Sequence, residues 1–344
     1  MSVIAGMKEI GITDIKGIKV GHASNYEAGT GCTAILCEEG ACASVDVRGG
    51  GPASRETELL RPEKMVERIH CVMLSGGSAY GLDAGAGAMQ YLEEKGIGFD
   101  VGVGVVPIVC GASLFDLELG DPKVRPDKAM GYAACQAAEA GKEPAMGVIG
   151  AGTGATVGKF RGADYMMKTG IGIYGVQVGD VQCAALVAVN ALGDIIDYDS
   201  HQPLAGMLDP EKKRIAGTLA AMYEELGKDR NIWTDDGSGE KPAPAAPAGE
   251  VTNTTLGVIV TNARLTKAQC SKLAQIAHNG YAQAIVPVHT SADGDTIFVL
   301  ATGETEASPD CLGALATEVM ARAICRSATE ATPCFGLKTA ADLR

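Results

Sequence analysis

The chain is poor in aromatic side chains, which make up only 4% of its 344 residues and include a single tryptophan. Few bulky rings are therefore at hand to anchor a core. Glycine is abundant, at 46 residues, and glycine runs within 48–51 and 75–78 predict tight turns and close approaches between backbone segments. We expect main-chain geometry to matter more than bulky side chains, with most of these glycines serving as connections.

Positive charge is also scarce, because 29 Lys and Arg residues face 42 Asp and Glu residues, for a net charge of −13. Nucleic acids and anionic membrane surfaces attract basic patches, so this balance disfavours both as partners. A small-molecule substrate is the expected partner.

Patterns for metal binding and export are missing as well. The 11 cysteines include no Cys-x-x-Cys pair; Cys32, Cys37 and Cys42 recur every five residues, and His22 alone does not complete a zinc site. No charged-then-apolar leader opens the chain, and no apolar run is long enough to cross a bilayer. We expect free thiols, no metal, no membrane span and a cytoplasmic location.

The amino-acid composition of the sequence changes abruptly at Asn253-Thr254. Upstream, 237–249 is rich in proline and small residues and predicts a flexible linker over about 235–250. Downstream, 255–261 is short, apolar and β-branched, as is typical of a strand buried on both faces. An exposed connector that meets a rigid strand is a place where a chain can cut itself.

Cleavage before Thr254 would create an α-amine, whose ordinary pKa of about 7.7 to 8.0 suits a base near neutral pH. The hydroxyl of Thr254 would then be the adjacent nucleophile, so one residue would supply both groups. An ordinary linker followed by an ordinary strand remains the simpler interpretation of this stretch taken alone.

A pair of carboxylates adds to the pattern. Asp293 and Asp295 precede an apolar segment at 296–301 that predicts another strand. Side chains at i and i+2 can point to one side of an extended segment, so one carboxylate could orient Thr254 while the other holds the first. Asp-Gly-Asp is also ordinary turn chemistry.

Seven motifs in order along the chain carry a family resemblance; they lie at 17–22, 45–51, 74–83, 152–159, 189–194, 253–255 and 293–296. Over about residues 12–326 the chain resembles the self-processing N-terminal-nucleophile hydrolases typified by L-aminopeptidase/D-esterase, with β-aminopeptidases and nylon-oligomer hydrolases as relatives. The resemblance implies autocleavage between Asn253 and Thr254 into an α chain of 1–253 and a β chain of 254–344. Thr254 would be the nucleophile, and no cofactor would be required.

The resemblance also implies roles for other residues. Asp293 and Asp295 match an acidic pair that supports the nucleophile, and Asn190 matches an asparagine that can donate to an oxyanion. Lys159 matches a lysine that nylon-oligomer hydrolases place beside the nucleophile, with Lys168 as the open alternative.

One departure concerns the substrate-binding region. Several relatives have an active-site tyrosine where this chain has Phe115, so a phenolic hydroxyl is missing. Tyr132 is a candidate substitute at a different spacing. The departure bears on oxyanion stabilisation and substrate preference more than on self-cleavage. Because loss of one oxyanion donor costs roughly 10²- to 10³-fold in rate, we expect the enzyme to be slow or to use another donor.

The pattern of segments predicts a mixed α/β protein, and the resemblance implies a four-layer αββα sandwich as one domain over 1–344. Strands are predicted at 18–20, 33–36, 43–47, 71–74, 183–189, 256–261 and 296–301. Helices are predicted at 79–95, 128–140, 210–226, from 266 through about 278, and from 308 through 323. Asp209 would cap the helix at 210–226, and Pro210 would open its first turn.

The leading functional hypothesis is an aminopeptidase-like amidohydrolase acting on small peptide, amide or ester bonds. Acidic residues such as Asp293 and Asp295 suit recognition of a substrate ammonium group. A nylon-oligomer hydrolase and an acyltransferase of the ornithine acetyltransferase type remain alternatives. The resemblance further implies a homo-oligomer, commonly a tetramer.

Overall fold

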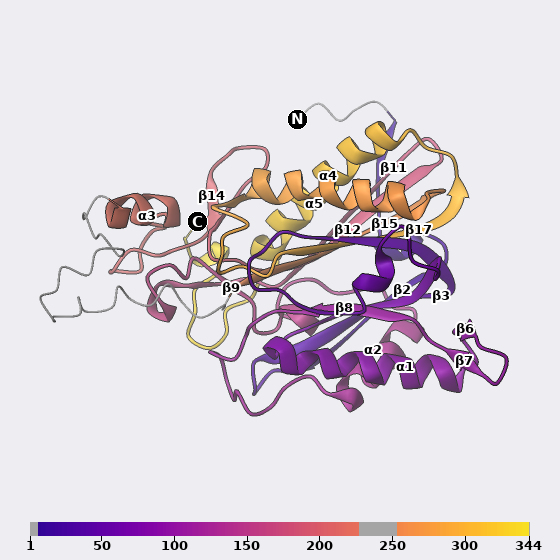
Figure 1. Ribbon diagram of the computed structural model, residues 1–344. Coiled ribbons are helices and arrows are strands. Elements are labelled where there is room, and N and C mark those ends of the chain that lie inside the picture. The colour runs from indigo at the N-terminus through magenta and orange to yellow at the C-terminus, as the bar shows by residue number, and fades with distance from the viewer. Residues whose placement is uncertain (1–5, 227–252, 344) are drawn as a thin grey trace, which may run out of the picture.

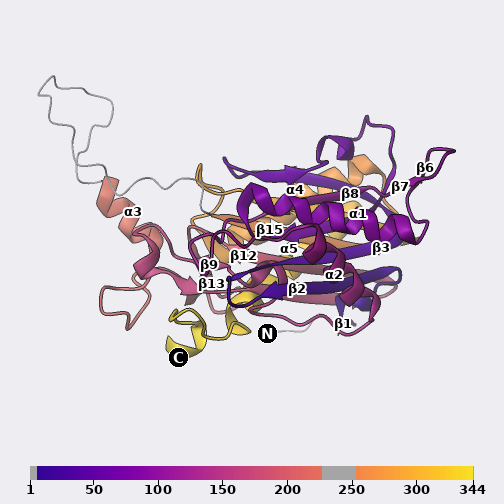
Figure 2. The same ribbon diagram turned by 90° about the horizontal axis from the view of Figure 1, so that it is seen from below.

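The computed structural model describes residues 6–226 and 253–343, and Figure 1 shows them as helices on both sides of layered strands. The linker predicted at about 235–250 lies outside these residues. Helices α4 and α5 cover one face, and α1 and α2 cover the opposite face (Figure 1). Seen from below, α1 lies in front of the strands (Figure 2).

Within the described residues, the main sheet has ten strands in the order β1-β11-β12-β15-β17-β3-β5-β8-β4, with β2 paired to β3. In chain order these are β1 Met7–Ile10, β2 Ile18–Asn25, β3 Thr30–Val47, β4 Ala53–Arg55, β5 Arg68–Ser75, β8 Val109–Ser113, β11 Ile171–Val178, β12 Val181–Asn190, β15 Thr254–Ala263 and β17 Thr296–Thr305.

The remaining elements are shorter strands and helices. The strands are β6 Phe99–Asp100, β7 Val105–Val106, β9 Thr156–Val157, β10 Met167–Lys168, β13 Asp194–Ile196, β14 Pro203–Ala205 and β16 Ile285–Val286. The α-helices are α1 Ala84–Glu94, α2 Lys128–Glu139, α3 Thr218–Leu226, α4 Lys267–Ala284 and α5 Pro309–Thr329. The 3₁₀ helices are η1 Ile12–Asp14, η2 Glu58–Leu60, η3 Ser78–Asp83, η4 Gly150–Gly152, η5 Ala163–Tyr165 and η6 Ala340–Leu343.

Strand β3 makes two strand layers out of one continuous sheet. Residues 30–37 of β3 pair with β2, and residues 42–47 pair with β17. β5 pairs mainly with the first half of β3, at residues 32–36. The sequence predicted two separate strands in this stretch, at 33–36 and 43–47, whereas the structure has one long strand that passes from one layer to the other.

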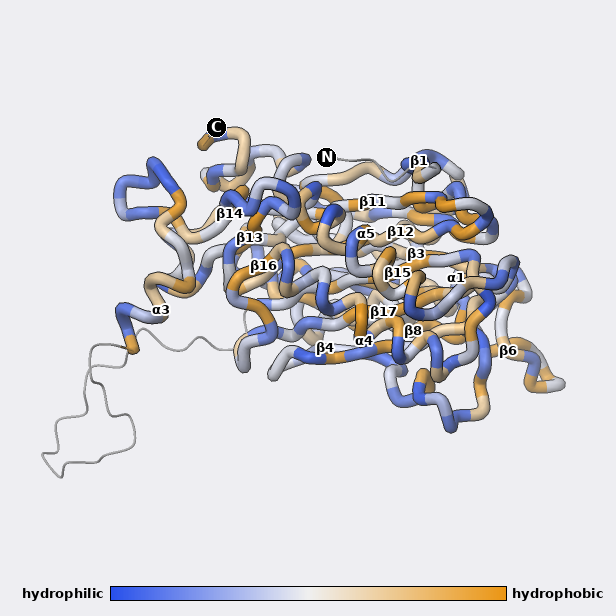
Figure 3. Tube along the Cα trace, turned by 90° about the horizontal axis from the view of Figure 1, so that it is seen from above, coloured by the Kyte–Doolittle hydropathy of each residue, from blue (hydrophilic) through white to orange (hydrophobic). Residues whose placement is uncertain are grey.

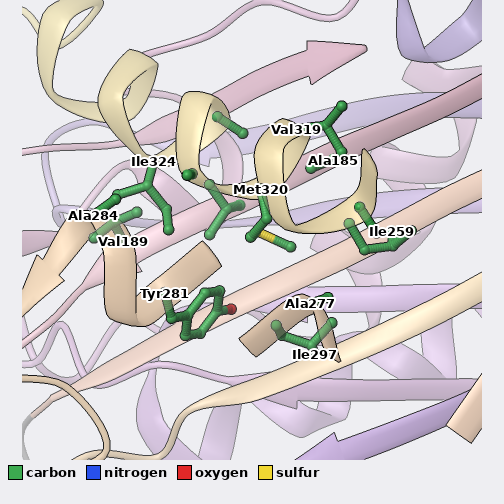
Figure 4. Packing of buried hydrophobic residues seen from close by; sticks show 14 of the residues in the cluster. Ala185, Val189, Ile259, Ala277, Tyr281, Ala284, Ile297, Val319, Met320 and Ile324 are labelled. Carbon is green, nitrogen blue, oxygen red and sulfur yellow. The ribbon is translucent and has the colours of Figure 1, made fainter. Parts of the chain in front are cut away.

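Three apolar clusters separate the four layers, which confirms the predicted αββα order. One lies between the strands and α4 and α5, one between the two strand layers, and one between the strands and α1 and α2. Figure 4 shows the first, where Tyr281 and Met320 pack beside Ile259 and Ile297. Hydrophobic stretches concentrate in this layered body (Figure 3).

Strand β15 is buried on both faces, as its apolar sequence predicts. Leu256, Val258 and Val260 face the space between the strand layers, and Ile259 faces α4 and α5. Because side chains alternate along a strand, Thr254 at its start faces the space between the layers.

The other predicted strands occur where expected, but one helix starts late. Asp209 and Pro210 were expected to open a helix at 210; instead α3 begins at Thr218. The carboxylate of Asp209 accepts a hydrogen bond from the amide of Lys213 at 2.8 Å and so closes a turn. Asp194 accepts the Thr218 amide at 2.6 Å, so a residue distant in sequence fixes the helix start.

In the part of the chain that the structure describes, no helix combines the length and the apolar character needed to cross a membrane.

Candidate active site

The candidate nucleophile lies where two neighbouring strands meet. Thr254, the first residue of β15, is directly opposite Asn190, the last residue of β12. Both side chains are buried, with Thr254 3% exposed and Asn190 fully enclosed. β9 lies at this end of the sheet, because the Thr156 amide donates to Asn190 Oδ1 at 3.0 Å (Figure 1).

The peptide bond between Asn253 and Thr254 is held by groups on both sides. The Thr254 hydroxyl donates to the carbonyl oxygen of Asn253, and the Gly294 amide donates to the same oxygen at 2.9 Å. Gly294 also leaves room for the hydroxyl, since a Cβ at that position would lie only 2.7 Å from Thr254 Oγ1. A nucleophile and a backbone donor therefore meet at one carbonyl group.

The two aspartates that flank Gly294 support different parts of the site. Asp295 Oδ1 accepts the Thr255 amide at 2.8 Å, next to the candidate nucleophile. Asp293 accepts the Thr290 amide at 2.9 Å and the Leu192 amide at 3.3 Å.

The two carboxylates therefore accept hydrogen bonds from different segments of the chain. Neither carboxylate bonds Thr254 itself. Burial, and then the negative charge of Asp295, raise the pKa of Asp293. Asp295 nonetheless fixes the strand residue that directly follows the nucleophile.

Lys159 contacts Asn190 beside this site. Its Nζ donates to Asn190 Oδ1 at 2.8 Å and to the Asn190 carbonyl at 3.1 Å. Burial lowers the pKa of Lys159 to about 7, against the opposing pull of carboxylates that include Glu118 and Asp293. A lysine with this pKa changes charge near neutral pH.

Lys168 occupies a different position. Its Nζ donates to three backbone carbonyls, of Gly152, Ala155 and Thr169, at 3.1, 2.7 and 2.6 Å. Burial lowers its pKa to about 8. Of the two lysines left open by the sequence, Lys159 is the one that contacts Asn190, while Lys168 joins backbone segments.

Phe115 reaches the site through its backbone. The Asn190 side-chain amide donates to the Phe115 carbonyl at 2.8 Å. Asn190 is thereby oriented by three neighbours, since its Oδ1 also accepts from Thr156 and Lys159. These bonds fix the orientation of the Asn190 side-chain amide, for which the family resemblance implies a role as oxyanion donor.

Tyr132 does not join the site, so its expected role as a substitute hydroxyl is wrong. It lies on α2 in the outer helix layer, where its hydroxyl donates to Glu94 at 2.6 Å and its ring packs edge-on against Tyr91 at 5.4 Å. The spacing between Phe115 and Tyr132 in the sequence could not reveal that α2, which carries Tyr132, packs against α1.

Two residues that were not predicted from the sequence belong to this region. Asp116, next to Phe115, accepts Thr30 Oγ1 and the Gly77 amide, both at 2.7 Å, and burial raises its pKa to about 6. His289 Nδ1 lies 2.8 Å from Asp295 Oδ2. The sequence signal that could have identified His289 is its position shortly before the Asp-Gly-Asp motif.

A metal is not suggested by the geometry. Among residues 6–226 and 253–343, no three His, Cys, Asp or Glu side chains gather as a metal site would require. The cysteines in this part of the chain are free thiols.

Comparison with known proteins places the chain among hydrolases. It is 37% identical over 365 residues to an uncharacterized aminopeptidase of Mycobacterium leprae, covering 95% of this chain and 92% of the relative. It is 32% identical over 331 residues to the 6-aminohexanoate-oligomer endohydrolase of a Kocuria species, covering 92% of this chain and 85% of the relative.

A solved structure agrees on the fold. The L-aminopeptidase D-Ala-esterase/amidase of Ochrobactrum anthropi, described as a variant of the Ntn hydrolase fold, superposes with a TM-score of 0.66 at 17% identity, covering 96% of this chain and 90% of that one. The model of peptidase family S58 matches residues 11–341. This chain therefore belongs to peptidase family S58.

Proposed function

We propose that this peptidase cuts its own chain between Asn253 and Thr254 and then uses Thr254 as an N-terminal nucleophile on small peptide, amide or ester substrates. One observation carries the proposal: the Asn253 carbonyl receives both the Thr254 hydroxyl and the Gly294 amide. A carbonyl polarised by a fixed donor beside a hydroxyl suits nucleophilic attack.

The cut proceeds by an acyl shift. Thr254 Oγ1 attacks the Asn253 carbonyl carbon, and the Gly294 amide stabilises the oxyanion. The carbon–nitrogen bond breaks, the hydroxyl proton passes to the departing nitrogen, and an ester joins Asn253 to Thr254. Water hydrolyses this ester, which leaves a carboxylate on Asn253 and a free amine and hydroxyl on Thr254.

Turnover uses the same residue. The Thr254 amine accepts the proton of its own hydroxyl, the hydroxyl attacks the substrate, and an acyl-enzyme forms as the substrate amine leaves. Water, deprotonated by the Thr254 amine, completes hydrolysis. Asn190 supplies an oxyanion donor, and a charged Lys159 lowers the pKa of the Thr254 amine by repulsion, so more of that amine is free base.

The two products of the cut would stay together as one domain. The β chain, 254–344, contributes β15 and β17, which pair with β12 and β3 of the α chain, 1–253. Asn253 is 1% exposed, so its displacement after the cut would open space at the nucleophile. A cytoplasmic location and a tetramer are also part of this proposal; the free thiols support the former.

Substrates with a free ammonium group are our first choice. Asp293, Asp116 and the exposed Glu118 give the surroundings of Lys159 a negative potential. A second candidate is an oligomer of an ω-amino acid. Lys159 beside Asn190 and the Kocuria relative favour it.

The cut is tested by replacing the nucleophile. Thr254→Ala should remain a full-length band on denaturing gels, whereas wild type and Thr254→Ser should yield a fragment that begins at residue 254. Intact mass and N-terminal sequencing identify the junction. A wild-type chain that stays whole while it remains active would refute the proposal.

The substrate is tested with a panel of L-, D- and β-amino-acid amides beside a 6-aminohexanoate oligomer. Release of amine from the α-amino-acid amides supports the first choice, and release from the oligomer alone supports the second. Hydroxylamine in the same reactions separates hydrolysis from acyl transfer, because a transferase would favour the hydroxamate product.

A further inference from the structure

His289 binds Asp295 through two of its own groups. Its backbone amide lies 3.1 Å from Asp295 Oδ2, and its ring Nδ1 lies 2.8 Å from the same oxygen. The other carboxylate oxygen, Oδ1, accepts the Thr255 amide at 2.8 Å. Asp295 thus links His289 to the residue that follows the nucleophile.

The backbone of His289 is held in an uncommon conformation. Its φ of 58° lies in the left-handed region, which a non-glycine residue adopts only where the surroundings enforce it. In this conformation the amide and the ring of His289 both lie within hydrogen-bond distance of one Asp295 oxygen. Such strain is typical of functional sites.

Three rings meet behind the carboxylate, in a chain that is otherwise poor in aromatics. His289 packs edge-on against His278 at 4.7 Å and stacks on Tyr281 at 5.8 Å. The Tyr281 hydroxyl lies 3.2 Å from the carbonyls of Thr255 and Thr296. Figure 4 shows Tyr281 rising from α4 into this part of the core. The cluster therefore contacts the starts of both β15 and β17.

The charged and titratable groups around His289 come from three parts of the chain. Asp293 and Asp295 precede β17, His278 and Tyr281 lie on α4, and Asp46 with Arg48 lies at the end of β3. Burial lowers the pKa of His278 to about 4, so this histidine is neutral near pH 7. Its Nε2 lies 3.2 Å from the Asp46 carbonyl, to which it donates.

The ring that donates to Asp295 is that of His289. A carboxylate only accepts, so Nδ1 of His289 carries the proton of their hydrogen bond. His289 donates from Nδ1 whether its ring is neutral or charged.

We propose that His289 is a positioning residue for self-cleavage and turnover: it fixes the Asp295 carboxylate, which holds the Thr255 amide and keeps Thr254 in register with the Asn253 carbonyl. This inference rests on the proposed function of Thr254. His289 touches no reacting atom, and acts through Asp295.

The test compares variants that keep or delete the donor. His289→Gly removes the ring and suits the left-handed backbone, so lost rate is not explained by backbone strain. His289→Asn places an amide donor at the Nδ1 position, and asparagine also tolerates that backbone. His278→Gln is the matched control, because it retains a donor toward Asp46 and lies in the same ring cluster.

Self-cleavage is followed as a time course on denaturing gels after cell-free synthesis. His289→Gly should cut roughly 10²-fold more slowly, the effect expected of a displacement of about 1 Å. His289→Asn should stay within roughly fivefold of wild type, since one neutral hydrogen bond is retained. In processed enzyme, His289→Gly should lower kcat with little change in KM.

The outcomes separate this inference from the proposed function. If wild type does not cut at Asn253, the proposed function fails. If wild type cuts and His289→Gly cuts equally fast, only the role of His289 is overturned. Equal slowing of His289→Asn and His289→Gly would also overturn it.

If His289→Gly does not fold, His289→Gln replaces it. Its amide lies one carbon farther out than that of asparagine, so it should cut more slowly than His289→Asn. Equal rates for these two variants would overturn the role assigned to the Nδ1 donor.

Discussion

Replacing Gly294 with alanine tests the site by adding one methyl group against the nucleophile. A Cβ at this position would lie 2.7 Å from Thr254 Oγ1 and 2.9 Å from the Gly51 carbonyl oxygen. Ordinary contacts between nonbonded heavy atoms are about 3.5 Å, so the hydroxyl must retreat by roughly 0.8 Å. The Gly294 amide and its bond to the Asn253 carbonyl are retained in Gly294→Ala.

The size of the effect follows from this displacement. A misplacement of about 1 Å can cost roughly 10²-fold in rate, so we expect self-cleavage of Gly294→Ala to be roughly 10- to 100-fold slower. Overpacking costs about 1–3 kcal/mol of unfolding free energy, which leaves a folded protein. The variant should therefore accumulate as folded, uncut precursor.

The assay is a pulse of cell-free synthesis followed by denaturing gels, with thermal unfolding measured on the purified precursor. Gly313→Ala is the control, because Gly313 lies on α5 and its new Cβ would meet the Ile276 side chain at 3.0 Å, with no atom of Thr254 among its nearest neighbours. The control should cut at the wild-type rate. Wild-type cleavage by Gly294→Ala would refute the placement of Oγ1 against this backbone.

Two further predictions concern pH. Because burial lowers the folded pKa of Lys159 to about 7 from 10.5, the unfolded chain binds more protons between these values, and unfolding free energy should rise with pH there. Lys159→Met should flatten that rise in urea titrations, and an unchanged slope would argue against a buried Lys159. Burial raises the folded pKa of Asp116 to about 6 from 3.8, so its stabilisation is present at low pH and is lost as pH rises through 6. Asp116→Asn should remove this loss when unfolding is measured between the two pKa values, and a loss of equal size in the variant would contradict the assignment.

Local sequence was sufficient wherever a residue's role depends on its neighbours in the chain. The apolar run after Thr254 specified a strand buried on both faces, and Thr266 specified a helix start by capping α4. The start of α3 could not be predicted, because Asp194, distant in sequence, accepts the Thr218 amide. A long-range contact overrode the local signal of Pro210.

The sequence by itself determined the family, the Asn253-Thr254 junction and the residue types that chemistry at this junction requires. Only the tertiary structure decided that Lys159, and not Lys168, contacts Asn190, that Tyr132 lies in the outer helix layer, and that His289 binds Asp295. The physical reason is that hydrogen bonds form between atoms brought within about 3 Å, and strand pairing and helix packing set those distances.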